Sequence, residues 1–288
     1  MTLIETVERQ SARLTQAGVS FGHGTGNAFD EAAWLVLWKL GLPLDELDEV
    51  AARQLTVAEV ASIDALIDER IATRKPTAYL THEAWLQGLP FYVDERAIVP
   101  RSLIAEVMAD GTLDAWLPEH PRRVLDLCTG NGSLAVLAAL AWPEVTVDAC
   151  DLSADALAVA RINVDKHGLA DRIALHQGDG LAAVAGQRFD VILCNPPYVN
   201  AESMAALPAE YRAEPALALA GGIDGMRFIR SQIKQAATHM NVHAVLVLEI
   251  GHEWAHFDAA FPTIECAWLP TSAGENQVLL MTRESLAA

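Results

Sequence analysis

The tetrapeptide Asn195-Pro196-Pro197-Tyr198 combines groups that could hold and orient an amide or amino group. It follows the apolar run 189–194, which is typical of a buried strand. Proline has no backbone N–H to donate, so two successive prolines end the strand and begin a stiff loop. Ligands of open α/β sheets bind at the carboxyl ends of the strands. There Asn195 Oδ1 and the Pro196 carbonyl could accept both hydrogens of a substrate –NH2, although Asn-Pro alone indicates only a turn.

A glycine turn marks a second site of possible chemistry. The predicted strand 124–128 runs into Thr129-Gly130-Asn131-Gly132, just before a predicted helix over 132–142. Glycines in a strand-to-helix turn let the backbone approach a ligand closely. The spacing of Gly130, Gly132 and Ala135 also matches the dinucleotide fingerprint. A nicotinamide-dependent oxidoreductase and a methyl-donor enzyme therefore both fit the turn.

Asp126 favours the methyl donor, because a pyrophosphate would be repelled by a carboxylate aimed into this turn. S-adenosylmethionine has no phosphate, and its ammonium and sulfonium groups gain from nearby negative charge. Asp151, at the end of the next predicted strand, could then accept hydrogen bonds from the ribose hydroxyls. Asp179, beside Gly180 in the turn after the third strand, could lie near the adenine amino group, and an ordinary turn acid fits it equally well.

The pattern of apolar residues predicts three regions. Residues 1–75 read as a helical domain, with helices near 3–19, 29–40 and 56–72, and residues 76–100 as a hairpin linker around Gly88 and Pro90. Residues 101–288 form the third region, which alternates strands with helices and therefore predicts an α/β fold with a parallel, doubly wound sheet closed by an antiparallel hairpin. The predicted strands are 124–128, 145–149, 173–176, 189–194, 244–249, 264–269 and 276–281, and the helices are 132–142, 153–167 and 225–240.

The charge of the chain indicates which kinds of molecule it could bind. The chain carries 20 Lys and Arg against 38 Asp and Glu, a formal net charge of −18. Such a chain is a poor binder of nucleic acid and would attract a basic protein, although the charge could serve solubility alone. The four cysteines show neither metal-binding spacing nor a secreted disulfide framework, and no signal peptide or membrane span is evident. We therefore expect a cytoplasmic protein without a metal.

These motifs closely resemble those of the glutamine-N5 methyltransferases, over nearly the whole chain. The resemblance rests on the run 126–132, on Asp151 and Asp179, on Asn195-Pro196-Pro197-Tyr198, and on Val99-Pro100-Arg101 before the core. The family's glycine turn commonly has Ser where this chain has Asn131, a small polar exchange. The resemblance implies a Rossmann-like class I methyltransferase core, with a seven-stranded, mostly parallel sheet, behind an N-terminal helical domain that recognises the protein substrate. It implies that the cofactor S-adenosylmethionine, and its product S-adenosylhomocysteine, are bound by Asp126, Leu127, Cys128, Thr129, Gly130, Gly132, Asp151, Asp179, Gly180 and Asn195.

Two branches of that family differ in their substrate. One methylates the Gly-Gly-Gln glutamine of release factors, and the other a glutamine of large-subunit ribosomal protein L-three. Residues 78–85, 91–96 and 99–102 resemble the ribosomal-protein branch, and 100–106 depart from the acidic Pro-Arg-x-x-Thr-Glu run of the release-factor branch. We therefore expect L-three as the substrate. An adenine-N6 DNA methyltransferase is a further alternative, because such enzymes use the same tetrapeptide. They must hold DNA and flip a base, usually with a basic region, and this chain has no such region. A non-catalytic assembly factor is the remaining alternative.

The expected mechanism relies on orientation, because an amide nitrogen is a poor nucleophile. Asn195 and Pro196 would hold the glutamine amide so that its nitrogen faces the sulfonium methyl group. Tyr198 would pack against that amide, Pro197 would stiffen the loop, and Arg101 would lie next to the site. No general base is required, so His82, His176, His252 and Glu249 are expected to be structural.

Overall fold

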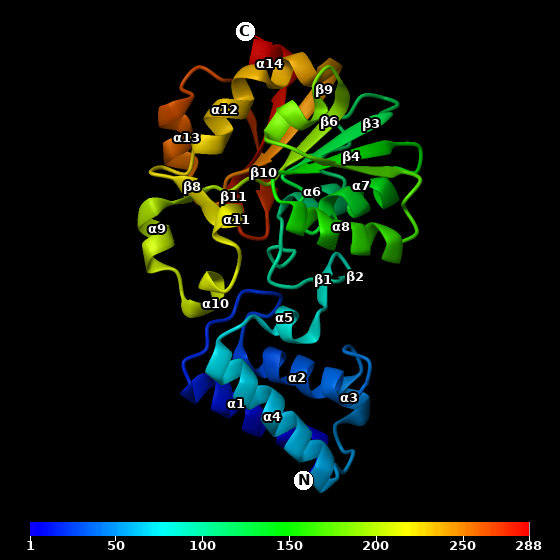
Figure 1. Cartoon of the computed structure of the whole chain (residues 1–288), viewed down its shortest axis with the longest axis vertical. Helices are drawn as coiled ribbons and strands as arrows, with labels where there is room; N and C mark the ends of the chain where they lie inside the picture. Colours follow the sequence, from blue (N-terminus) through cyan, green and yellow to red (C-terminus); the bar gives the residue numbers. More distant parts are fainter. Residues whose placement is uncertain (288) are drawn as a thin grey trace. The chain divides into compact units, whose positions relative to one another are not determined.

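The computed structural model describes residues 1–287 and divides the chain into two units (Figure 1). The helical unit contains Met1–Ala84 and Leu207–Glu214, and the sheet unit contains Trp85–Ala206 and Pro215–Ala288. The division after Ala84 falls inside the expected linker. Nothing in the sequence pattern predicted that residues 207–214, expected in the core, would belong to the helical unit.

The helical unit forms around helices with strong N-terminal signals. Thr2 with Glu5, and Thr56 with Glu59, make complete capping boxes that satisfy the first backbone N–H groups of two helices. Leu3, Leu35 and Ile63 are fully buried where these helices pack together. The helices are α1 (Leu3–Gln16), α2 (Ala28–Lys39), α3 (Leu47–Val50), α4 (Val57–Thr73), α5 (Thr77–Thr81) and α10 (Ala209–Arg212).

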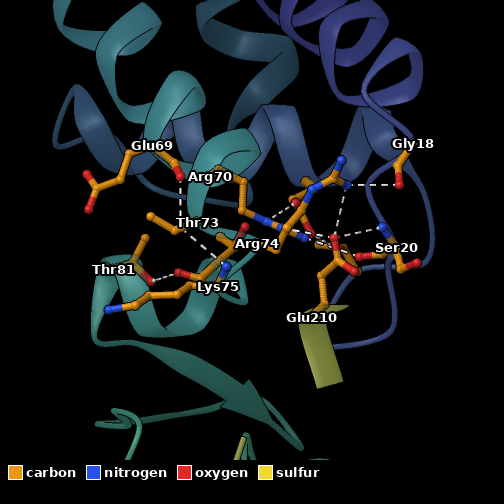
Figure 2. A network of polar contacts seen from close by, with 12 residues as sticks. Gly18, Ser20, Glu69, Arg70, Thr73, Arg74, Lys75, Thr81 and Glu210 are labelled. Carbon is orange, nitrogen blue, oxygen red and sulfur yellow. Dashed lines mark hydrogen bonds and ion pairs between the residues drawn. The ribbon is translucent and has the colours of Figure 1, made fainter. Parts of the chain in front are cut away.

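A buried ionic network holds residues 207–214 in the helical unit (Figure 2). Arg70 donates through Nε to Glu31 Oε1 at 2.9 Å and through Nη1 to Glu210 Oε1 at 3.4 Å. Arg74 Nη1 and the Ser20 backbone N–H also donate to Glu210 Oε1, at 3.4 and 3.2 Å. Burial opposes ionisation of Glu210, but backbone hydrogen bonds and the charge of Arg70 outweigh it and lower its pKa.

The expected linker is a helix followed by a short hairpin. Residues 78–80, expected to be extended, lie in α5, because Pro76 precedes them with a φ of −48° and its carbonyl accepts from Tyr79 N at 2.9 Å. The hairpin itself is confirmed: β1 (Ala84–Leu86) and β2 (Leu89–Phe91) form a two-stranded sheet. Gln87 and Gly88 make the tight turn with φ of 49° and 72°.

The sheet unit contains the predicted α/β fold. Seven strands lie in the order β10-β11-β9-β6-β3-β4-β5, and all pairings from β9 to β5 are parallel. The expected antiparallel hairpin is confirmed, since β11 runs antiparallel to both β9 and β10. The strands are β3 (Arg123–Leu127), β4 (Thr146–Asp151), β5 (Ile173–Gln177), β6 (Phe189–Cys194), β9 (Met240–Glu249), β10 (Ala267–Thr271) and β11 (Gly274–Thr282).

Helices cover both faces of this sheet (Figure 1). Val124 and Val191 pack in one core with helices α6, α7 and α8, whereas Leu125 and Ile192 pack in the other with α12 and α13. Alternate residues of each central strand thus enter opposite cores, which explains their continuous apolar sequence. The helices and remaining strands are α6 (Ile104–Ala109), α7 (Ser133–Ala141), α8 (Ala154–Lys166), η1 (Gly180–Val184), β7 (Val199–Asn200), α9 (Ala201–Ala206), α11 (Ala216–Leu219), β8 (Ala220–Gly222), α12 (Arg227–Ala236), η2 (Ala237–His239), α13 (Trp254–Ala260) and α14 (Arg283–Ala287). No helix in the described part of the chain is long and apolar enough to cross a membrane.

The strand register brings the predicted functional turns to one edge of the sheet. Leu127 is the Cα partner of both Cys150 and Cys194. Cys194 in turn pairs with Leu248 on the next strand. The turns that follow these four residues must therefore lie side by side along the carboxyl edge.

Candidate functional site

A cavity of about 370 Å³ lies at the carboxyl edge of the sheet. This is within the size range of small-molecule sites. Its walls include eight residues that the sequence predicts for the site: Leu127, Cys128, Gly130, Asp151, Asp179, Gly180, Asn195 and Pro197. The sequence motifs, spread over more than sixty positions, therefore do converge on one site.

The glycine turn has a backbone conformation that favours glycine at two points. Gly130 and Gly132 have φ of 55° and 80°, in the left-handed region that favours glycine. A Cβ on Gly132 would lie 3.2 Å from Ala160 Cα, so this glycine lets α7 and α8 approach each other. A Cβ on Gly130 would meet nothing within 4 Å and would project into open space beside the cavity wall. A ligand can thus approach the Gly130 backbone directly.

Asp126 and Thr129 lie beneath this turn and do not line the cavity. Asp126 Oδ2 accepts hydrogen bonds from Thr129 Oγ1 and from Ala135 N, the latter at 3.0 Å. Asp126 Oδ1 is buried and has no partner among the described residues. Burial raises the pKa of Asp126 to about 7. Asp126 therefore shapes the turn, and its predicted interaction with a cationic cofactor stays a prediction.

The raised pKa of Asp126 predicts a pH-dependent stability. Its folded value of about 7 lies above the ordinary 3.8, so the folded state binds this proton more tightly than the unfolded state. The stabilisation that this proton provides is complete below the pKa of Asp126 in the unfolded state. It is lost as pH rises toward the pKa in the folded state, and each unit of difference between the two pKa values corresponds to about 1.4 kcal/mol. In urea unfolding without added cofactor, the free energy of unfolding of Asp126→Asn should rise relative to that of the wild type between about pH 4 and pH 7. Parallel pH curves for the two proteins would contradict this assignment.

Asp151 is the carboxylate best placed to meet a ligand. It lines the cavity, and its Oδ2 accepts from Gly130 N at 2.9 Å while its Oδ1 accepts from Ser153 N at 2.8 Å. Burial raises its pKa against the lowering effect of these backbone N–H groups. Each oxygen retains a second lone pair that could accept a ligand hydroxyl. Asp179 is exposed and lines the same cavity just before η1. These carboxylate acceptors suit a cationic, hydroxyl-bearing nucleoside such as S-adenosylmethionine.

The residues of the Asn-Pro-Pro-Tyr loop face different surroundings. Asn195 is half-buried and lines the cavity together with Pro197. Pro196 is buried, and neither it nor Tyr198 lines the cavity. The Tyr198 hydroxyl instead donates to Glu249 Oε1 at 3.1 Å. The packing of Tyr198 against a substrate amide thus stays a prediction.

Arg101, expected next to the site, does not line the cavity. Its Nη1 donates to the Val99 carbonyl at 3.1 Å, two residues earlier in the chain. A substrate contact for Arg101 stays a prediction.

Part of the cavity wall was not predicted from the sequence. Arg96 and Ile98 come from the segment that follows the hairpin, and Arg96 is paired with Asp94, whose pKa it lowers to about 2. Six further unpredicted wall residues belong to segments that carry no recognisable motif: Pro215, Leu217, Ala218, Arg227, Phe228 and Ser231. The only sequence signal was the amphipathic pattern of α12.

Comparison with known proteins identifies relatives along the whole chain. Residues 110–213 match the model of the methyltransferase small domain. A ribosomal protein uL3 glutamine methyltransferase of Burkholderia pseudomallei is 52% identical over 100% of this chain and 96% of its own length. One of Bordetella pertussis is 51% identical over 99% of this chain and 96% of its own length.

Solved structures agree on the fold. A methyltransferase from Pyrococcus furiosus superposes with a TM-score of 0.51 at 18% identity, over 76% of this chain and 97% of its own. At that identity the likeness concerns the fold alone, which is that of the class I methyltransferases. The full-length identities above are far higher, and the chain belongs to the ribosomal protein uL3 glutamine methyltransferase family.

Proposed function

We propose that this protein transfers the methyl group of S-adenosylmethionine to the side-chain nitrogen of a glutamine in ribosomal protein uL3. The observation that carries the proposal is the position of Asn195, a hydrogen-bonding amide in the wall of a cavity that two carboxylates, Asp151 and Asp179, also line. The relatives that match nearly the full chain are named for this reaction.

Some residues of the site would bind the cofactor, and others would bind the acceptor amide. Asp151 would accept from the ribose hydroxyls while Gly130 leaves room for the rest of the cofactor, which supplies an electrophilic methyl group when bound. Asn195 Oδ1 and the Pro196 carbonyl would accept the two hydrogens of the glutamine amide. This fixes the nitrogen, whose lone pair is delocalised, in the orientation needed for in-line attack. The proton can leave the nitrogen after transfer, so no side chain needs to act as a strong base.

The charge of the chain supports a protein acceptor. A net charge of −18 would draw a basic ribosomal protein toward the enzyme and repel a polyphosphate. The relatives named for uL3 come from bacteria, whose ribosomes are assembled in the cytoplasm, so we propose that the reaction occurs there.

Labelled methyl transfer to three acceptors in parallel tests this proposal. The acceptors are free uL3, a release factor and duplex DNA, followed by peptide mapping of the label. We expect label on a glutamine of uL3 alone. Label on the release factor would keep the chemistry and overturn the choice of substrate, and label on DNA would overturn the substrate class and the charge reasoning together.

A further inference from the structure

We propose that Glu249 is a positioning residue for methyl transfer, which fixes the Asn-Pro-Pro-Tyr loop by anchoring Tyr198. This inference rests on the proposed function, in which that loop holds the acceptor amide. Glu249 is the last residue of β9, next to β6 in the sheet, so its side chain lies near the loop that leaves β6. The sequence suggested only a structural residue at this position.

The Glu249 carboxylate is buried, with 3% of its surface exposed, and it binds three donors. Tyr198 Oη donates to Oε1 at 3.1 Å, and Ser102 Oγ and Leu103 N donate to Oε2 at 2.6 and 2.9 Å. Burial raises the pKa of Glu249, against the lowering effect of these hydrogen bonds. One carboxylate thus joins the acceptor loop to the segment that follows the linker.

Three glycines shape the space that Tyr198 occupies. A Cβ on Gly251 would lie 2.6 Å from Tyr198 Cε2, and one on Gly225 would lie 2.2 Å from the Tyr198 carbonyl oxygen. A Cβ on Gly221 would lie 2.7 Å from the Tyr198 carbonyl carbon. Real Cβ atoms do not approach so closely. Tyr198 is therefore enclosed at its ring and its backbone, and its hydroxyl has a fixed partner.

The fixed position of Tyr198 also restricts the position of Asn195, because the two residues are joined by two prolines. A proline ring fixes φ near −65°, so Pro196 and Pro197 leave few backbone rotations free. On the other side of Tyr198, the Asn200 amide donates to Glu253 Oε1 at 2.7 Å. Two carboxylates from one short segment, Glu249 and Glu253, thus fix the chain beyond the prolines. Misplacement of a reacting group by about 1 Å can lower the rate about a hundredfold, so we expect this anchor to affect turnover.

The variants Tyr198→Phe and Glu249→Gln, alone and combined, test the proposal. Tyr198→Phe keeps the enclosed ring and removes only the hydroxyl, so the fold is retained even if Glu249→Gln is unstable. The control is Glu106→Gln, because Glu106 also accepts from a serine hydroxyl and a backbone N–H, those of Ser272, and does not line the cavity. The acceptor is whichever one the wild-type protein labels, so a wrong assignment of uL3 would show in the wild type and would leave this test intact.

We expect each single variant to lower kcat about tenfold or more, with KM for the acceptor and S-adenosylhomocysteine affinity within about threefold of wild type. The double variant should resemble the single ones, because both changes remove the same interaction. Glu106→Gln should leave kcat unchanged. Full turnover of Tyr198→Phe, or additive losses in the double variant, would overturn the proposal, as would equal losses in the control.

Discussion

Asn195→Ala is expected to lower methyl transfer about a hundredfold or more while S-adenosylhomocysteine affinity stays within about threefold of wild type. Asn195 lines the cavity at the end of β6, where its Oδ1 can accept a hydrogen from the acceptor amide. Without that hydrogen bond the amide nitrogen is no longer oriented toward the methyl group. The loss should therefore appear in kcat, since the other cavity residues still bind the cofactor product.

Asn195→Asp is the matched variant for this prediction. Its carboxylate keeps an oxygen acceptor of nearly the same size, so it should retain clearly more turnover than the alanine variant. Methyl transfer is measured with labelled cofactor, and affinity for S-adenosylhomocysteine by calorimetry. An alanine variant with turnover within about tenfold of wild type would contradict the role given to Asn195. An equal loss of cofactor-product affinity would instead assign this residue to cofactor binding.

Arg70→Ala is expected to destabilise the helical unit by about 3–5 kcal/mol, the usual cost of removing one partner of a buried ion pair. Arg70 is 1% exposed, and its removal leaves the buried carboxylates of Glu31 and Glu210 without their main counter-charge. The Ser20 carbonyl also loses a hydrogen bond from Arg70 Nη2. Urea unfolding followed by circular dichroism in the far ultraviolet, where helices give the strongest signal, measures the change in the free energy of unfolding.

Arg13→Ala is the control, because the Arg13 side chain is 31% exposed and pairs with Asp64 and Asp68 at the surface. Such exposed ion pairs contribute about 1 kcal/mol or less to the free energy of unfolding. The pKa of Glu210 lies below its ordinary 4.5, so the buried network should contribute fully above that pH and be lost as pH falls through the folded value. Similar losses of stability in Arg70→Ala and Arg13→Ala would show that burial does not strengthen the Arg70 network.

The sequence by itself determined the elements that carry local periodicity and the motifs at their ends. All seven strands of the sheet were predicted within a few residues. The clearest signal came from the central strands such as β6, which are buried on both faces and are therefore nearly continuous apolar runs. The turn at Gly130 and the loop at Asn195 were identified because glycine permits left-handed backbone conformations and proline fixes φ and removes an N–H donor, both through their own covalent structure. Parallel strands then require those two motifs to meet at one edge, so the centre of the candidate site could be located before the structure was known.

Only the tertiary structure decided which charged side chains are buried and with what partners. A Glu has the same sequence signature in solvent as in a core, so the pairing of Glu210 with Arg70, 140 residues apart, and that of Glu249 with Tyr198, 51 residues apart, leave no local pattern. The same reason explains why the cavity wall at Arg96 and Leu217 was missed, and why Asp126 lies beneath the turn. These positions depend on the desolvation of groups brought together by folding, which no periodicity along the chain encodes.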